Sequence, residues 1–505
     1  SNTGEIIATS SLFGFGGLSP APSIANLDNA GPAEIIIGRH VFSLETVGGT
    51  LQFLDHFEGT LGSGTTSGNG PLSCAGNLVG DARLEIVAGT TVYKFPNGPS
   101  GITRRADCLG TEVGEEADWC NGVLPVVWNA VTVDPTATNE GFSAVVDLWG
   151  ADSGSAPGPN NPLDGVPEVV VVSNGFLQVF NGQTGNLIVK QNLMAGTGGG
   201  APTVADFDGD GFPEVGSAWG NRYIMVDFQE SGPDCPIWSN AFIDSIPGLQ
   251  GNAPRDPPNT PCSQDSDCGD PSQFGCNEAT SECICLQNGW ARIIEDDSSR
   301  VTGSSGFDLN GDNAAEVLYN DECYLRIYAG SDGTLLFRQN SPNRTVLEYP
   351  VIADVDNDGS AEIVAVSNNE ASFCSVGSNY PNGITVLGDV ANTFRPARRI
   401  WNQHSYHITN VNEDGSIPMP EMDSWQLDNS YRSNSCGGVL ACGSRQLGDV
   451  DGSGMVDESD IDDFAAIAID STSATADEFC AADVNQDSSV NGGDIPGFVE
   501  LILAL

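Results

Sequence analysis

Short apolar runs recur along most of the chain, each followed by a turn rich in Asp and Asn and then by a second apolar run that opens with glutamate. The second runs are rich in Val and Ile, as in residues 168–173, which is typical of buried strands. Residues 177–189 and 325–337 alternate apolar and polar positions around Gln-Thr-Gly and Ser-Asp-Gly turns, a pattern that predicts β-hairpins. We therefore expect an all-β fold over most of the length.

The glutamates that open the second runs define the period of an internal repeat. They fall at positions 34, 85, 168, 214, 316 and 362, and the two shortest intervals, 168 to 214 and 316 to 362, are both 46 residues. The longer intervals contain a Pro/Asn-rich stretch at 151–167 and a cysteine-rich stretch at about 233–289. A period of about 45–50 residues with several strands per unit is typical of propeller blades. Six or seven units predict a closed ring, for which we expect seven blades, and an array of two-sheet sandwiches is the alternative.

Three of the turns carry oxygen-bearing side chains at alternate positions and a glutamate at position nine. Such a turn directs several oxygens at one centre, and hard oxygen ligands without His or Cys select calcium, or else magnesium, over zinc or copper. An ordinary Asx turn without a metal is the alternative. The expected ligands are Asp206, Asp208, Asp210 and Glu214 in the first turn, Asp308, Asn310, Asp312 and Glu316 in the second, and Asp354, Asp356, Asp358 and Glu362 in the third.

Four further turns, near Asn26, Asn77, Asp147 and Asn410, are degraded copies of this pattern. The first two have lost carboxylates, the third is separated from its glutamate by an insertion, and the fourth, a candidate seventh unit, ends differently. Whether these turns bind calcium stays open from the sequence.

The repeat resembles the FG-GAP repeats of integrin α-subunit propellers and their bacterial relatives, over roughly residues 5–430. The resemblance implies a calcium ion on the rim of each blade, held by the loop residues named above. This chain departs from the family in having Glu instead of Asp at position nine. The longer side chain either ligates differently or anchors the following strand.

From Gly448 the pattern changes to a duplicated loop followed by an amphipathic helix, at a spacing of 34 residues between Asp449 and Asp483. Ser488 replaces the turn glycine of the second loop, which is expected to weaken that site. The expected ligands are Asp449, Asp451, Ser453, Asp457 and Asp460 in the first loop, and Asp483, Asn485, Asp487, Asn491 and Asp494 in the second.

This duplication resembles a type I dockerin, which implies docking of two helices on a cohesin-type β-sandwich. The partner is another protein, the propeller of the same chain or a neighbouring copy, and a free-standing calcium module is the alternative. We therefore divide the chain into a propeller (1–435, with the insertion at about 233–289), a linker (436–447) and a dockerin-like domain (448–505).

The charge balance excludes some partners and favours an extracellular location. With 18 basic and 68 acidic residues the net charge is −50, which opposes binding to nucleic acid or anionic membranes. No apolar stretch is long enough to span a bilayer. Fourteen cysteines indicate an oxidising compartment and a disulfide-stapled insertion, and the absence of an initiator Met is what a processed, secreted chain would show.

The sequence offers little for catalysis, with four histidines and none of the common hydrolase or phosphate-binding motifs. Residues 398–407 concentrate cations and aromatic rings, and form either a ligand patch or packing where the last blade closes. We expect a secreted, calcium-binding structural or assembly protein that docks on a partner or polymerises as a homo-oligomer, in a surface filament or matrix. The alternatives are a carbohydrate-binding adhesin or lectin and, third, a polysaccharide lyase.

Overall fold

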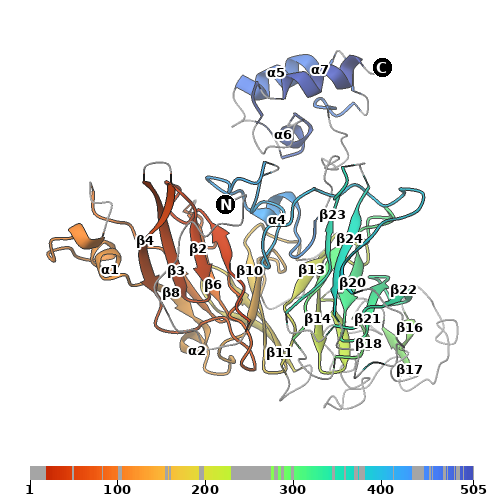
Figure 1. Ribbon diagram of the computed structural model, residues 1–505, viewed down its shortest axis with the longest axis horizontal. Coiled ribbons are helices and arrows are strands. Elements are labelled where there is room, and N and C mark those ends of the chain that lie inside the picture. The colour runs from red at the N-terminus through yellow and green to blue at the C-terminus, as the bar shows by residue number, and fades with distance from the viewer. Residues whose placement is uncertain are drawn as a thin grey trace.

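The computed structural model of the chain (Figure 1) describes most residues between Ser19 and Leu503. The described ranges are 19–47, 50–81, 83–100, 105–153, 157–158, 161–192, 198–228, 274–277, 282–285, 289–296, 301–343, 347–357, 360–368, 374, 382–412, 414–434, 448–453, 456–457, 459–469, 474, 476–482, 484, 490–492 and 494–503. Asp358, Asp483, Asn485, Asp487, the linker and most of the cysteine-rich insertion therefore lie outside the described residues.

Six antiparallel sheets follow one another along the chain, five with four strands and the sixth with three. They are β1 (Ser23–Ala25), β2 (Glu34–Ile37), β3 (His40–Val47) and β4 (Thr50–Glu58); β5 (Cys74–Gly76), β6 (Glu85–Ala88), β7 (Thr91–Lys94) and β8 (Val126–Asn129); β9 (Phe142–Val146), β10 (Glu168–Ser173), β11 (Phe176–Asn181) and β12 (Leu187–Asn192); β13 (Thr203–Ala205), β14 (Glu214–Trp219), β15 (Arg222–Val226) and β18 (Trp290–Ile293); β19 (Ser304–Phe307), β20 (Glu316–Asn320), β21 (Tyr324–Tyr328) and β22 (Leu335–Asn340); and β23 (Val351–Ala353), β24 (Glu362–Ser367) and β25 (Gly383–Leu387). A hairpin of β16 (Phe274–Asn277) and β17 (Glu282–Cys285) belongs to the insertion.

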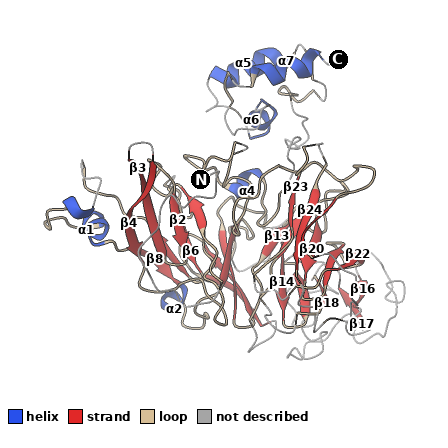
Figure 2. Ribbon diagram, in the orientation of Figure 1, coloured by secondary structure: helices blue, strands red, loops and turns tan. Residues whose placement is uncertain are grey.

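The order of the sheets is propeller-like, and the protein is mostly β (Figure 2). The first strands β1, β5, β9, β13, β19 and β23 are neighbours in that order. Apart from the β16–β17 hairpin, the described residues thus form six sheets where we expected seven blades, and the seventh blade is not confirmed. The candidate seventh unit after Asn410 contains no strand within its described residues.

The packing between sheets explains the turn glycines of the hairpins. Trp128, from the last strand of the second sheet, donates its indole N–H to the Gly182 carbonyl of the third at 2.7 Å, and Trp290 of the fourth sheet bonds to Gly330 of the fifth at 2.5 Å. At the tip of the fifth-sheet hairpin, Gly333 has φ +69°, and a Cβ there would lie 2.5 Å from the Trp290 ring. The turn needs glycine both for its left-handed backbone and for this close approach.

Residues 398–434, which we call the central segment, run along the first strands of the sheets. Tyr431 exchanges two backbone hydrogen bonds with Val204 of β13, at 3.0 and 2.8 Å, and the Arg432 carbonyl accepts from Gly306 of β19 at 3.1 Å. Other bonds reach Ile24 of β1, Asp147 after β9 and Ile352 of β23. Of the cationic and aromatic cluster in this segment, Arg398 and His407 are buried, so they pack inside the protein and do not form an exposed patch.

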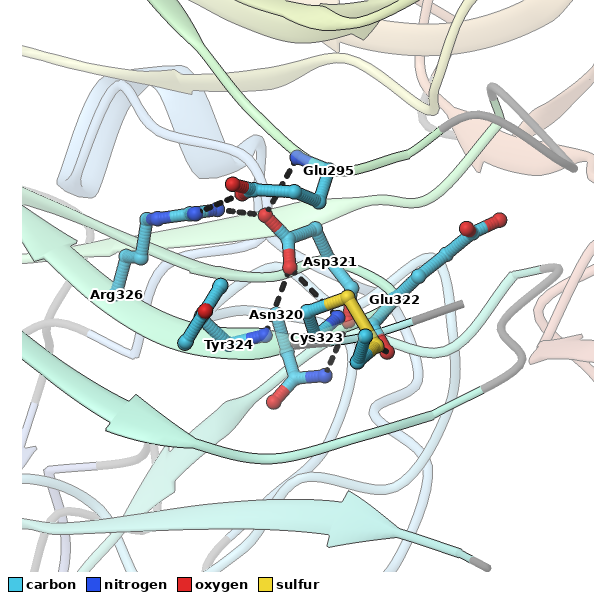
Figure 3. Close-up of a disulfide and its surroundings, with 8 residues drawn as sticks. Glu295, Asn320, Asp321, Glu322, Cys323, Tyr324 and Arg326 are labelled. Atoms are coloured by element: carbon cyan, nitrogen blue, oxygen red, sulfur yellow. Dashed lines mark hydrogen bonds and ion pairs between the residues drawn. A yellow bond between two sulfur atoms is a disulfide. The ribbon is translucent and has the colours of Figure 1, made fainter. Parts of the chain in front are cut away.

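Two disulfides lie in the described residues, Cys108–Cys120 and Cys323–Cys374. Figure 3 shows the second one beside Asp321, which pairs with Arg326. Because Arg326 of β21 also pairs with Glu295, which follows β18, this cluster ties the fifth sheet to the fourth.

The helices are short and few in the described residues. The propeller-like part carries the 3-10 turn η1 (Arg105–Asp107), α1 (Glu115–Asn121), α2 (Ala130–Val133) and, in the central segment, α4 (Ser424–Leu427). A separate helical unit follows, with α5 (Asp460–Ile469), α6 (Ala476–Ala482) and α7 (Ile495–Leu503). The rings of Phe464 and Phe498 stack at 4.0 Å between α5 and α7. None of the helices in the described part of the chain has the length and apolar character needed to cross a bilayer.

Candidate cation-binding loops

A buried glutamate at the start of the second strand holds the loop in every one of the six sheets. Its Oε2 accepts a hydrogen bond from the backbone N–H that comes immediately after the loop's first residue, seven residues earlier in five sheets and 20 residues earlier in the third, whose loop contains the insertion. The six bonds run from Leu27 to Glu34, Leu78 to Glu85, Leu148 to Glu168, Phe207 to Glu214, Leu309 to Glu316 and Val355 to Glu362, at 2.6–2.9 Å. We call these residues the clamp glutamates; anchoring, one of the two roles expected at position nine, is thus observed in all six.

Burial makes the clamp glutamates hard to ionise. Loss of solvation is the main cause, and nearby loop carboxylates add to it. It raises the pKa of Glu34 to about 8, of Glu85 to about 7, of Glu168 to about 9 and of Glu316 to about 7, and raises the pKa of Glu214 well above its ordinary range. A bound cation would oppose this effect by favouring the charged form.

The loop of the fourth sheet gathers the acids expected from the sequence. One oxygen each from Asp206, Asp208 and Asp210 lies within 4.8 Å of the others. Asp206 also accepts backbone bonds from Gly209 at 2.7 Å and Gly211 at 2.9 Å, which shape the turn. Burial and the two neighbouring aspartates raise the pKa of Asp208 to about 7. The second oxygen of Glu214, Oε1, is buried and has no hydrogen-bond partner.

The loop of the sixth sheet forms a second group in which the clamp glutamate itself takes part. Oxygens of Asp354, Asp356 and Glu362 lie within 4.8 Å of one another. This geometry suits a cage of hard oxygen ligands for a calcium-sized ion.

The loop of the fifth sheet differs from these two because an arginine reaches it. Arg395 Nη1 lies 2.6 Å from Asp308 Oδ2. Asn310 donates to Asp312 at 3.0 Å and to Glu316 at 3.2 Å, so its amide nitrogen, and not its oxygen, faces these acids. The described carboxylates of this loop do not come together as a group of three.

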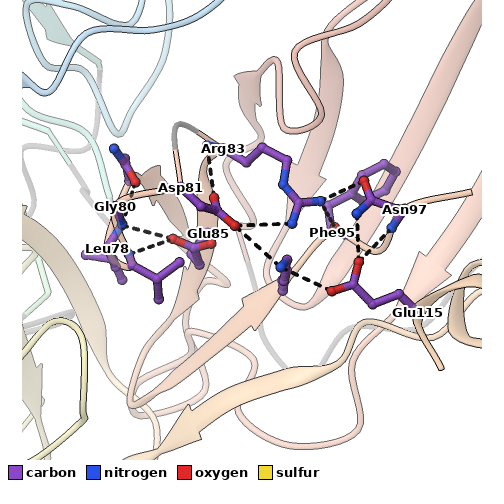
Figure 4. Close-up of polar contacts among 11 residues, drawn as sticks. Leu78, Gly80, Asp81, Arg83, Glu85, Phe95, Asn97 and Glu115 are labelled. Carbon is purple, nitrogen blue, oxygen red and sulfur yellow. Dashed lines mark hydrogen bonds and ion pairs between the residues drawn. The ribbon is translucent and has the colours of Figure 1, made fainter.

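The degraded loops use hydrogen bonds and basic side chains. The Asn26 side chain accepts from Ala30 at 2.9 Å and donates to Gly31 at 3.2 Å, which closes the first loop. In the second sheet, Asp81 lies near the clamp residue Glu85 and pairs with Arg83 at 3.3 Å (Figure 4).

The loop of the third sheet keeps the local geometry of the fourth-sheet loop despite its insertion. Asp147 accepts from Gly165 at 2.8 Å, as Asp206 accepts from Gly211. Asp164 accepts from Val166 at 2.9 Å, as Asp210 accepts from Phe212. Sequence analysis did not assign Asp164 because the insertion precedes it, although residues 164–168 match 210–214 at the Asp, Gly, Pro and Glu positions.

The helical unit brings together part of each expected ligand set. Oxygens of Asp449, Asp451 and Asp460 lie within 4.8 Å of one another. Asp460 is fully buried and accepts from the backbone N–H groups of Asp451 and Asp457, both at 2.9 Å. Asp494 accepts in the same way from Asn491 at 2.8 Å. Ser453 and Asp457 lie on the same loop but outside the carboxylate group.

An apolar groove runs between α5 and α7 of this unit. It is lined by Ile461, Phe464, Ala465, Ala468, Ile469, Gly492, Ile495, Phe498, Val499 and Ile502. Ile461, Ile495 and Val499 are each about half exposed, and Ile469 is 87% exposed.

Comparison with known proteins identifies the repeat. The family model described as FG-GAP-like repeat matches residues 163–217 and 308–365, so the chain contains FG-GAP-like repeats in these two regions. This confirms that part of the resemblance, and the dockerin-like part stays a prediction. No curated protein matches the chain.

Several solved structures match the chain at low similarity. The V. cholerae biofilm matrix protein Bap1 is 16% identical, with a TM-score of 0.48, over 83% of this chain and 77% of Bap1. The Bacillus licheniformis rhamnogalacturonan lyase PL11 is 14% identical, with a TM-score of 0.33, over 69% of this chain and 43% of the lyase. An Agrocybe aegerita lectin that recognises non-reducing terminal N-acetylglucosamine is 13% identical, with a TM-score of 0.28, over 63% of this chain and 65% of the lectin. Likeness this distant carries no argument about function.

Proposed function

We propose that the chain is a secreted structural protein whose loops bind calcium and whose C-terminal helical unit docks on a protein partner or a second copy. The observation that carries the proposal is the recurrence of oxygen-only acidic groups, two on sheet loops and one on the helical unit. Carboxylate ligands without His or Cys favour calcium over transition metals. We propose a non-catalytic role, and cleavage of an acidic polysaccharide by the purified chain would overturn that part.

Calcium would stabilise the sheets by fixing the loops that connect their strands. Each loop joins the first strand of a sheet, which contacts the central segment or a neighbouring sheet, to the second strand. Without a cation, the grouped carboxylates repel one another and resist ionisation, as the raised pKa of Asp208 shows. A divalent ion removes this repulsion and fixes the loop, so its binding adds to folding stability.

The extracellular location rests on the disulfides and the charge. Cys108–Cys120 and Cys323–Cys374 would be reduced in most cytosols. Millimolar extracellular calcium also suits a protein with a net charge of −50, most of which the proposed sites leave as surface charge.

Docking is proposed at the groove between α5 and α7. Its exposed Ile and Val side chains form a continuous apolar lining, which marks an interaction surface on a protein otherwise rich in charge. A partner with a flat apolar face, or the same groove of a second copy, would bury it.

Sizing and negative-stain imaging of the full chain, with calcium and with EGTA, test the proposal. We expect a calcium-dependent assembly, or capture of a specific partner, that Val499→Glu abolishes. Leu109→Glu is the matched control, because Leu109 is 80% exposed and lies near α1, outside the groove between α5 and α7. Assembly that ignores EGTA and Val499→Glu would contradict the docking role. A melting temperature unchanged by EGTA would contradict the structural role of calcium.

A further inference from the structure

The residue that faces the clamp glutamate across the sheet differs between sheets in its charge. The third strand pairs antiparallel with the second, so directly opposite side chains lie on the same face with Cβ atoms about 5 Å apart. Glu85 pairs with Lys94 in the second sheet and Glu168 with Asn181 in the third. In the fourth sheet Val215 pairs with Val226, which places Asp227 opposite Glu214. The facing residue is therefore basic, neutral and acidic in three successive sheets.

In the second sheet the facing residue supplies a cation from the protein itself. Lys94 Nζ lies 3.5 Å from Asp81 and 3.1 Å from Glu115. Figure 4 shows Asp81 and Glu115 on either side of this contact, with Glu85 beside Asp81. The positive charge of Lys94 lowers the cost of ionising Glu85. A loop with a built-in ammonium group has little need for a bound ion.

In the fourth sheet the facing residue has the opposite effect. Asp227 and Glu214 are 4% and 2% exposed, and the two carboxylates repel each other. Glu214 uses Oε2 to hold the Phe207 N–H, while its buried Oε1 has no hydrogen-bond partner. The charges of Asp227, and of Asp208 and Asp206 in the loop, all act on the Glu214 carboxyl group. A buried acceptor left without a partner is costly unless a ligand satisfies it.

The sixth sheet provides a comparison in which the facing side chain is missing. Ile363 pairs with Leu387, so Gly388 stands opposite Glu362. A Cβ at Gly388 would meet Glu362 Oε1 at 3.4 Å, which is ordinary van der Waals contact. A short side chain fits there without displacing its neighbours.

We infer that Asp227, which the loop motif does not include, is a further member of the cation site of the fourth sheet and makes it the chain's tightest site for a divalent cation. The inference rests on the proposed calcium binding by the loops. Asp227 acts either as a direct oxygen ligand or by adding negative charge beside Glu214 that attracts the ion, and both routes need its carboxylate.

Calcium titration of the full chain and of Asp227→Asn, followed by calorimetry and equilibrium dialysis, tests this. Asn181 stands at the equivalent place in the third sheet, so the sheet accommodates the amide. We expect the tightest calcium ion to bind about 10- to 100-fold more weakly, with the other ions unchanged. Asp332→Asn, in the turn of the fifth-sheet hairpin and outside the cation-binding loops, removes the same charge and should leave every affinity unchanged.

Two more variants separate the possible outcomes. Gly388→Asp should tighten calcium binding at the sixth sheet, and in EGTA Asp227→Asn should melt at a higher temperature than the natural chain because a repulsion is removed.

Unchanged calcium affinity in Asp227→Asn would overturn the inference alone. If Asp208→Asn together with Asp210→Asn released no calcium, the proposed function itself would fail. An equal loss of stability in Asp227→Asn with and without calcium would show a purely structural role and would also overturn the inference.

Discussion

At the residue scale, each repeat is held by the carboxylate of its clamp glutamate, which accepts a backbone hydrogen bond whether or not a metal ion is bound. The periodic glutamates were visible in the sequence, and the structure shows the same bond in loops that keep their acids and in loops that have lost them. From the sequence, anchoring was one of two possible roles for these glutamates. A carboxylate acts as an anchor only where the backbone places an N–H group next to it, and the sequence does not show that position. Asp227 was missed for a related reason: its position opposite Glu214 is set by strand register, outside the loop motif.

The anchoring role predicts the effect of removing a clamp glutamate. Glu168 accepts from Leu148 at 2.9 Å and from Trp149 at 2.8 Å. Glu168→Ala leaves both N–H groups buried without acceptors, and we expect a loss of about 2–4 kcal/mol in the free energy of unfolding. Glu168→Gln keeps an oxygen acceptor and should lose about 1 kcal/mol. Urea unfolding measures both, with the exposed Glu116→Ala as control, and equal losses for Ala and Gln would contradict the anchoring role.

At the element scale, a turn can form locally as the motif predicts while the segment after it packs in a way that the motif does not predict. The turn after Asn410 closes with Gly415 N–H on the Asn412 carbonyl at 2.9 Å and Ser416 N–H on Asp414 at 2.8 Å, the second of which matches Phe212 N–H on Asp210. No strand follows among the described residues, because the next residues lack a glutamate at position nine and the β-branched run of the repeat, and contain two prolines. A motif search therefore finds the turn but cannot show that the segment packs along the first strands.

Arg432 tests how much the central segment contributes to stability. It is fully buried, donates to the carbonyls of Pro202 and His404, and lies 4.9 Å from the Tyr431 ring centre. Arg432→Ala removes the Arg432 donor from both carbonyls, of which the His404 carbonyl keeps a second donor, the Tyr349 hydroxyl at 2.7 Å. It also opens a cavity, so we expect a loss of about 3 kcal/mol. Arg338→Ala, on an exposed strand, should change stability by about 0.5 kcal/mol or less. Chemical denaturation distinguishes them, and similar small effects would show that the segment is dispensable.

The contact between neighbouring sheets makes a separate prediction at Gly333. Alanine there meets both the left-handed backbone cost, about 1–2 kcal/mol, and the ring of Trp290. Gly68 has φ +82° and open space around its Cβ position, so Gly68→Ala isolates the backbone cost. We expect the thermal midpoint to fall clearly further for Gly333→Ala than for Gly68→Ala. Equal shifts would mean that the sheets separate easily at this contact.

At the scale of the whole molecule, the period of the sequence predicted a mostly β, repeat-built protein, and the FG-GAP-like match at two regions agrees with it. The number of sheets could not be predicted from the period alone. It depends on whether the chain fills the space beside the first strands with another sheet or with irregular structure, and residues 398–434 take the second course. That choice is made by contacts between residues hundreds of positions apart, such as Ile24 with Gln403.

The buried acids of several sheets together predict how stability depends on pH. Folding raises the pKa of Glu34, Glu85 and Glu168 from about 4.5 to about 8, 7 and 9. At a pH between the unfolded and the folded pKa of each group, the folded chain binds more protons than the unfolded chain. Without a divalent cation, the contribution of these three groups to stability is therefore greatest below about pH 4.5. It falls as pH rises toward 9, by up to about 1.4 kcal/mol per group and pH unit.

Calcium should remove the corresponding dependence at the loop of the fourth sheet, where burial also raises the pKa of Glu214 and Asp208, because the ion favours the ionised carboxylates and their folded pKa values drop. The stabilisation by calcium should therefore grow from pH 5 to pH 9. Melting temperatures across this range, in calcium and in EGTA, measure the difference, with magnesium as a control for general ionic effects. Two parallel curves would mean that the raised pKa values and the cation sites are not coupled, and that the acidic loops fold the same way with or without an ion.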